Sequence, residues 1–135
     1  MLKSGLTHPA LLAALARAGH GSRVLLADGN YPTSTAAHPR ATLIELSLRS
    51  GLPTVPDVLE LILPILPIEG AAVMTPGDGD APAHADYARR LAPIQLQRLD
   101  RHAFYAAARN DDLAVVVATG DARHFSNLLL TVGVA

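Results

Sequence analysis

The sequence predicts a single α/β domain with three layers, in which helices flank a mostly parallel sheet. Its 135 residues are enough for one domain with a substantial core, and 50% of them are hydrophobic. Short apolar runs of strand length alternate with longer segments that have helical periodicity, as in α/β proteins. No internal repeat or linker interrupts residues 1–135, so we expect a single domain.

The first half of the chain is expected to form two helices and two strands. Proline is tolerated in the first turn of a helix, and Ser or Thr just before that turn can cap it. Prolines within a Ser/Thr cluster indicate a loop. The expected elements are a helix from His8 that is capped by Thr7 and stops at Gly19, a strand over 24–28, a loop over 29–41, a strand over 42–48, and a helix after Thr54 that ends at Pro64 and Pro67.

The second half is expected to contain two more helices and four more strands. Residues 113–118 form its clearest strand signal, because the run is apolar and rich in β-branched valine. The expected elements are a strand over 71–74, a loop over 75–82, a helix over 83–91, a strand over 94–99, a helix over 101–109 capped by Asp100, a strand over 113–118, a turn over 120–126, and a strand over 127–132.

The composition argues against several classes of protein. The net charge is −1, so no basic surface is expected to bind nucleic acid or an anionic membrane. There is no cysteine, which excludes disulfides and thiolate chemistry and fits a reducing compartment. No signal-peptide core follows Lys3, and the apolar run over 58–68 is too short to span a bilayer. We therefore expect a soluble, cytoplasmic protein, and its low charge favours burial of some surface between subunits.

Two polar residues flank the first predicted strand. Asp28 closes the strand, and ligands of α/β sheets bind at the carboxyl ends of strands. His20 lies just before the strand, and histidine titrates near neutral pH. Each residue also has a purely structural interpretation: His20 can stabilise the end of the preceding helix, and Asp28 can form a turn.

Other candidate residues stand at element boundaries. Arg101 begins a predicted helix, where the helix dipole does not favour a cation, and Asn127 opens a buried strand. Motifs for phosphate loops, dinucleotide binding and serine hydrolases are missing. The six histidines lack metal-ligand spacing, and the GDGD of residues 77–80 lacks the ligands of a calcium loop. We therefore expect no metal site.

Four blocks of sequence resemble the ribose pyranase and fucose mutarotase family, the RbsD/FucU type. Their order and spacing agree with that family over nearly the whole chain. The blocks are GHG with the following strand (19–28), GLPTVPDVLELILPI (51–65), RHAFYAAA (101–108) and ATGDARHFSNLLLTVGV (118–134).

The resemblance implies an RbsD-like fold and an activity. Members of this family interconvert the anomers or ring forms of a free monosaccharide, without a metal or a cofactor. They assemble as pentamers or decamers, with the sugar pocket between neighbouring subunits. By motif position, His20 matches the catalytic histidine and Asp28 its aspartate partner. Arg101 matches the arginine of the fucose branch, and Asn127 matches the asparagine that holds the sugar.

The sequence departs from the family pattern near its end. Phe125 stands where the family carries a tyrosine, so one hydroxyl group of the expected sugar-binding set is missing. His124, the preceding residue, is a candidate replacement. An alternative function is therefore a sugar-binding or transport-associated accessory protein in which catalysis has weakened.

The residue types suit sugar ring opening. Mutarotation removes a proton from the anomeric hydroxyl and delivers one to the ring oxygen, and a histidine can perform both transfers. Arginine and asparagine can hold the sugar hydroxyls. We expect Asp28 at the ligand edge of the sheet, with His20 beside it.

Overall fold

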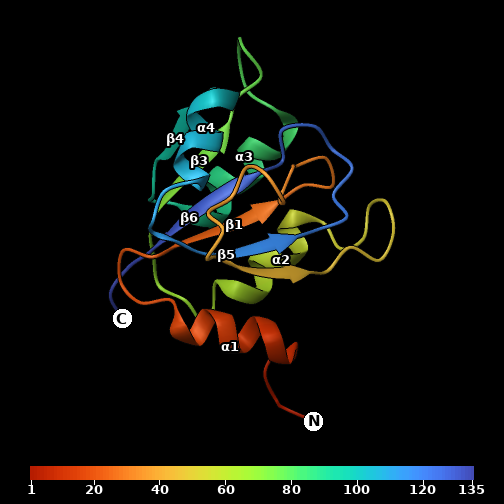
Figure 1. Cartoon of the computed structure of the whole chain (residues 1–135), viewed down its shortest axis with the longest axis vertical. Coiled ribbons are helices and arrows are strands. Elements are labelled where there is room, and N and C mark those ends of the chain that lie inside the picture. Colours follow the sequence, from red (N-terminus) through yellow and green to blue (C-terminus); the bar gives the residue numbers. More distant parts are fainter.

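A six-stranded sheet forms the centre of the computed structural model, which describes all 135 residues (Figure 1). The strand order is β2-β5-β1-β6-β3-β4. The strands are β1 (Arg23–Ala27), β2 (Thr42–Glu45), β3 (Ile68–Met74), β4 (Leu96–Leu99), β5 (Leu113–Ala118) and β6 (Leu128–Val132). The helices are α1 (Pro9–Arg17), α2 (Val55–Ile62), α3 (Pro82–Leu91) and α4 (Arg101–Ala108).

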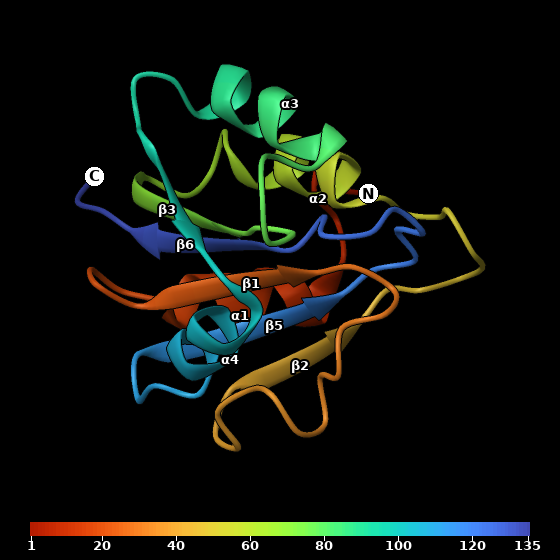
Figure 2. The same cartoon turned by 90° about the horizontal axis from the view of Figure 1, so that it is seen from above.

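The sheet is mostly parallel, which confirms the expected fold class. β5 pairs in parallel with β1 and β2, and β3 pairs in parallel with β4. The exception is β6, which lies antiparallel between β1 and β3 and joins the two parallel groups (Figure 2). The site described below forms where β1 ends and β6 begins.

The two faces of the sheet carry separate apolar cores. Successive residues of a strand point to opposite faces, so Val24 and Leu26 join one core while Leu25 and Ala27 join the other. Side chains of α1, α2 and α3 cover the first face. Helix α4 covers the second together with part of the loop over 29–41. In Figure 2, α4 crosses in front of the sheet and α1 lies behind it.

The caps expected for α2 and α4 are present. The Thr54 hydroxyl oxygen accepts from the Asp57 N–H at 3.3 Å, and the Asp57 carboxylate accepts from the Thr54 N–H at 2.7 Å. Asp100 caps α4 by accepting a backbone N–H at 2.8 Å. The cap expected for α1 is wrong: the ring of His8, and not Thr7, accepts the N–H of its first turn.

Several element boundaries differ from the expected ones by a few residues. Helix α1 ends at Arg17 before it reaches Gly19. β2 and β4 are shorter than expected because these edge strands each pair with only one neighbour. β3 begins earlier, at Ile68, because its pairing with β6 extends to Val132. No helix combines the length and the hydropathy needed to cross a membrane.

Candidate functional site

A small cavity of about 210 Å³ lies at the carboxyl end of β1. It combines polar and aromatic side chains, and it is smaller than the roughly 300–1,000 Å³ of sites for drug-sized ligands. Segments from both halves of the chain form its wall. The lining residues are Asp28, Asn30, Tyr31, Met74, Arg101, Tyr105, His124, Phe125 and Asn127.

Asp28 is the most firmly held polar side chain of this cavity. It is only 5% exposed, and its own N–H donates to the side-chain oxygen of Asn127 at 2.8 Å. Its carboxylate accepts the backbone N–H of Asn30 at 3.0 Å and that of Ser126 at 3.3 Å. These contacts fix the carboxylate before any ligand binds.

The environment raises the pKa of Asp28 above its ordinary value. Burial is the main cause, because it disfavours the charged form, and the nearby carboxylate of Asp121 adds repulsion. The backbone N–H groups of Asn30, Ser126 and Tyr31 oppose this rise by stabilising the anion. The carboxyl group therefore takes up a proton at a higher pH than an ordinary aspartate.

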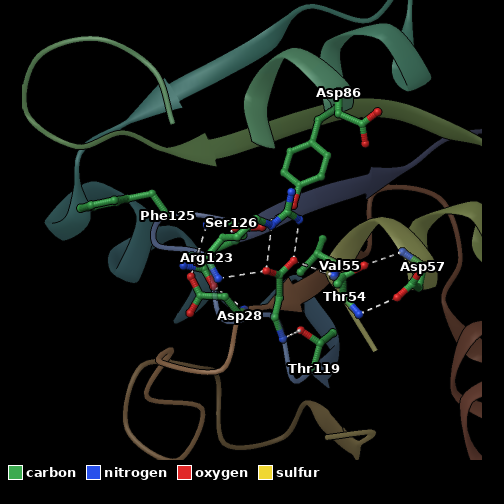
Figure 3. A network of polar contacts seen from close by, with 12 residues as sticks. Asp28, Thr54, Val55, Asp57, Asp86, Thr119, Arg123, Phe125 and Ser126 are labelled. Carbon is green, nitrogen blue, oxygen red and sulfur yellow. Dashed lines mark hydrogen bonds and ion pairs between the residues drawn. The ribbon is translucent and has the colours of Figure 1, made fainter. Parts of the chain in front are cut away.

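Asp121 organises the loop after β5 through bonds to Arg123 and Val55, two residues that are labelled in Figure 3. It is 1% exposed and accepts the N–H of Val55 at 3.0 Å and the Nη2 of Arg123 at 2.6 Å. Burial alone would raise the pKa of Asp121, but the hydrogen bonds from Arg123 and Val55 outweigh it and lower the pKa. Asp121 therefore stays charged and ties this loop to the start of α2.

A second buried contact fixes the same loop. Gly120 lies where a Cβ would collide with the carbonyl oxygens of Arg49 and Leu52. Its N–H donates to the carbonyl of Pro53 at 2.9 Å, and its own carbonyl accepts the N–H of Gly51 at 2.6 Å. Only glycine allows this close approach, so the segment over 49–53 closes against the loop.

Helix α4 supplies the opposite wall. Arg101 is its first residue and makes no ion pair or hydrogen bond within the chain, so its guanidinium is available to a ligand. Tyr105 follows one turn later on the same side of the helix. Its ring meets that of Tyr31 edge to face, with the centroids 5.4 Å apart. The Tyr31 hydroxyl already donates to the Ala36 carbonyl at 2.6 Å, whereas the Tyr105 hydroxyl has no partner in the chain.

His20 lies at the other end of β1, so the expectation that it stands beside Asp28 is wrong within one subunit. His20 precedes the strand and Asp28 follows it, and five strand residues span about 16 Å. The side chain of His20 is 60% exposed, and its Nε2 lies 3.1 Å from both carboxylate oxygens of Glu69. The carboxylate that contacts His20 is therefore Glu69.

The structure brings together four of the five residues singled out from the sequence. They are Asp28, Arg101, Phe125 and Asn127, and His124 lines the cavity beside them. Asn30, Tyr31, Met74 and Tyr105 also line it but were not expected there. For Tyr105 a signal existed, since it lies four residues after Arg101 in a helix. Phe125 adopts a left-handed backbone conformation, with φ of 58°, which turns the chain into the cavity.

A small, partly polar cavity at the carboxyl ends of strands in an α/β sheet defines a protein that binds a small polar ligand. The model of the RbsD / FucU transport protein family matches residues 1–135. The chain belongs to this family, which confirms the resemblance seen in the sequence.

Relatives from both branches of the family match the chain. D-ribose pyranase 2 of Streptomyces griseus subsp. griseus is 33% identical and covers 99% of this chain and 98% of its own length. Fucose mutarotase of Homo sapiens is 34% identical and covers 96% of this chain and 90% of its own. The structure of Bacillus subtilis RbsD complexed with D-ribose superimposes with a TM-score of 0.84, at 23% identity, over 100% of this chain and 99% of that chain. That structure confirms the fold.

Proposed function

We propose that this protein is a mutarotase that interconverts the anomers, or the pyranose and furanose forms, of a free monosaccharide such as L-fucose or D-ribose. The observation that carries the proposal is the cavity, which combines a fixed carboxylate, a free guanidinium and an amide in a member of this family. The relatives named D-ribose pyranase and fucose mutarotase support both the reaction and the substrate class. Arg101 favours the fucose branch.

In this proposal the cavity binds and orients the sugar. Asp28 accepts hydrogen bonds from sugar hydroxyls, because its carboxylate has capacity beyond the two backbone donors. Arg101 donates to sugar oxygens, and Asn127 offers its amide N–H groups while its oxygen holds the N–H of Asp28. Directed contacts of this kind hold the ring so that the anomeric carbon faces one proton-transfer group.

We propose that the proton-transfer group is His20 of a neighbouring subunit. Within one chain His20 is separated from Asp28 by the length of β1, yet its exposed side chain is free to face another copy. A head-to-tail contact that joins opposite ends of β1 in successive copies generates a ring when the rotation between copies closes. This supports sites between subunits, and the family resemblance implies that the ring is a pentamer or decamer. The lack of cysteine supports a cytoplasmic location.

The reaction needs only proton transfers. His20 removes the proton of the anomeric hydroxyl and, as the imidazolium, delivers it to the ring oxygen, so the C1–O5 bond breaks and an open-chain carbonyl forms. Rotation about C1–C2 presents the other face of the carbonyl, and the reverse transfers close the ring. No atom or electron is gained or lost, so this sequence needs no redox partner. A positioned acid and base of this kind contributes on the order of 10²–10⁴-fold.

Glu69 determines which ring nitrogen of His20 is free to take up a proton. Since Nε2 of His20 faces the Glu69 carboxylate, Nε2 carries a proton and Nδ1 is left free to accept one. A carboxylate in this place also stabilises the imidazolium that forms during the transfer. Glu69 thereby takes the part that the sequence assigned to Asp28 as the partner of the histidine.

One observation favours a second candidate function. Phe125 lines the cavity without the hydroxyl of the family tyrosine, as in a protein that binds a sugar but no longer converts it well. Two other side chains of the cavity can replace that hydroxyl, the His124 imidazole and the unpartnered Tyr105 phenol. Their presence favours the mutarotase.

Exchange NMR of the anomeric protons separates the two functions. Equilibrated L-fucose and D-ribose are measured with and without the protein. Faster exchange of one sugar, abolished in His20→Ala, supports the mutarotase and identifies the sugar. Saturation transfer to a sugar without faster exchange supports the accessory protein, and no effect on either sugar contradicts both functions.

A further inference from the structure

We propose that His84 and Tyr87, two buried side chains of α3, are positioning residues that hold the backbone over Phe125 and Ser126 and thereby place the Asp28 carboxylate for catalysis. The inference rests on the proposed function and extends it, since neither residue lines the cavity. Both act from the far side of the loop that forms the cavity floor.

His84 has one arrangement of its ring proton that satisfies both nitrogens. It is 1% exposed, and its Nδ1 accepts the N–H of Ala81 at 3.2 Å. Nδ1 therefore has no proton, and Nε2 donates its own to the carbonyl of Phe125 at 3.0 Å. The carboxylate of Asp80 lies 3.7 Å from Nδ1, which is too far for a hydrogen bond. One end of the ring is anchored to the start of α3 and the other to the loop.

Tyr87 makes the same kind of contact one turn along the helix. Its hydroxyl donates to the carbonyl of Ser126 at 2.7 Å, and the ring is fully buried in the larger core. Two successive carbonyls of the loop thus accept from two side chains on one face of α3. A buried carbonyl that loses its donor is costly, so these contacts strongly favour one position of the loop.

The loop needs such support. Phe125 has a φ of 58°, a conformation that side-chain-bearing residues avoid unless neighbouring contacts impose it. The His84 bond ends on the carbonyl of this same residue. A chain released from that bond is expected to relax toward an ordinary φ, which would move the peptide between Phe125 and Ser126.

We call the two bonds from His84 and Tyr87 to the carbonyls of Phe125 and Ser126 the clamp. The backbone that the clamp holds also contacts Asp28 directly. The N–H of Ser126 donates to Oδ2 of Asp28 at 3.3 Å, already a long bond, and Asn127 follows with its contact to the Asp28 N–H. A small shift of the loop would therefore weaken two contacts of Asp28 together. Loss of the Ser126 donor would raise the pKa of Asp28 further, because that donor stabilises the anion.

The α3 substitutions do not change the other charged or titratable groups near Asp28. They are Asp121 on the loop after β5, Tyr31 after β1, Arg101 and Tyr105 on α4, His124 before Phe125 and, in the proposed assembly, His20 of the neighbouring subunit. Since these groups are common to wild type and variants, a change in the acid limb of the activity profile reports on the Ser126 contact.

The test compares Tyr87→Phe, His84→Ala and His84→Gln in steady-state mutarotation, using whichever of L-fucose and D-ribose the wild type converts. Tyr87→Phe removes one oxygen and keeps the buried ring, so we expect it to fold. We expect Tyr87→Phe and His84→Ala to lower kcat by about 10- to 100-fold, the range caused by small misplacements, and to move the acid limb to higher pH. His84→Gln keeps a donor and should recover part of kcat.

His8→Ala is the matched control. His8 also accepts a backbone N–H through Nδ1, at the start of α1, and it does not line the cavity. It should lower the melting temperature without changing kcat, KM or the acid limb. The proposal is overturned if Tyr87→Phe behaves like this control. A wild type that converts neither sugar would refute the proposed function and the clamp with it, whereas an active wild type with an unaffected Tyr87→Phe refutes the clamp alone.

Discussion

The two ends of β1 are built in opposite ways. At the carboxyl end, Asp28 is buried, accepts two backbone N–H groups and is tied to β6 through Asn127. At the amino end, the exposed ring of His20 contacts one other exposed side chain, Glu69. The polar side chain at the carboxyl end is held by hydrogen bonds within the subunit, whereas the one at the amino end is exposed and accessible to a partner.

Because of this difference, we expect substitutions at the two ends of β1 to affect stability and activity differently. A buried carboxylate that accepts two backbone N–H groups contributes to the fold as well as to any reaction, so changes around it affect both. An exposed pair contributes little to the fold, typically about 0–1 kcal/mol, so changes in it should affect the reaction alone. Variants at the two ends can therefore test the comparison.

The largest effect is expected for His20→Ala. Loss of the proton-transfer group should lower mutarotation by about 10²–10⁴-fold. Because the side chain is mostly exposed, the free energy of unfolding should change by less than about 0.5 kcal/mol. Exchange NMR and urea unfolding measure the two quantities. An activity within twofold of the wild type would remove His20 from the reaction.

Mixed assemblies should restore part of that activity. If His20 and Asp28 of one site come from different subunits, co-expression of His20→Ala with Asp28→Asn creates some sites with both native residues. Random mixing in a ring gives about one quarter of such sites, and hence about a quarter of the wild-type rate. The same assay on each variant alone is the control. A mixture no more active than the single variants would contradict a site that takes His20 and Asp28 from different subunits.

Asp121→Asn should cost stability at the carboxyl end. It removes the charge that binds Arg123 and the N–H of Val55, so we expect a loss of about 2–3 kcal/mol in the free energy of unfolding. The pKa of Asp121 is lowered in the fold, so its contribution is present above its ordinary value of 3.8 and is lost as pH falls through the folded value.

Denaturant unfolding over a range of pH checks this prediction. The difference between wild type and Asp121→Asn should be constant from neutral pH to about pH 5 and should shrink at lower pH. Asp28, whose raised pKa works in the opposite direction, is present in both proteins and its contribution largely cancels. A difference that grows on acidification would contradict the assignment.

A smaller effect on activity is expected for Glu69→Gln. The neutral amide still reaches the His20 ring but no longer stabilises its charged form, so we expect kcat to fall about tenfold. The melting temperature should stay within about 1 °C, since both side chains are exposed. Asp111→Asn, which alters an exposed partner of His38 elsewhere, is the control. Equal activity of the two variants would leave Glu69 without a role.

The smallest effect is expected for Phe125→Tyr. The change restores the family hydroxyl in the cavity, and one hydrogen bond of about 1 kcal/mol corresponds to about a fivefold gain in kcat/KM. A much larger gain would mean that Phe125 had suppressed catalysis, as the accessory function requires. No gain would mean that His124 or Tyr105 already supplies the missing contact.

Most of the fold could be predicted from the sequence because its signals are local. Apolar runs, proline positions and the capping residues Thr54 and Asp100 indicated where the elements lie. Strand order and the antiparallel direction of β6 could not be predicted, since they depend on pairings between distant segments.

The site was predicted less completely for the same reason. Asp28 and Asn127 stand at strand ends, where a pattern can be recognised, and they meet in the structure. The pairing of His20 with Glu69 was missed, because the two residues come together only when β6 aligns the turn before β1 with β3. The contacts of His84 and Tyr87 end on backbone carbonyls, which leave no signal in a sequence.

The central position of β6 has a consequence for synthesis of the chain. The ribosome makes every other strand first, yet the groups β2-β5-β1 and β3-β4 have no common edge until β6 pairs with both. Leu26 of β1 cannot pair until Leu128 of β6 has been made, and long-range pairings of this kind are slow to form. A nascent chain that has produced β5 but not β6 therefore exposes two strand edges that the finished fold pairs, those of β1 and β3, and we expect it to be most prone to aggregate or to need a chaperone in this interval.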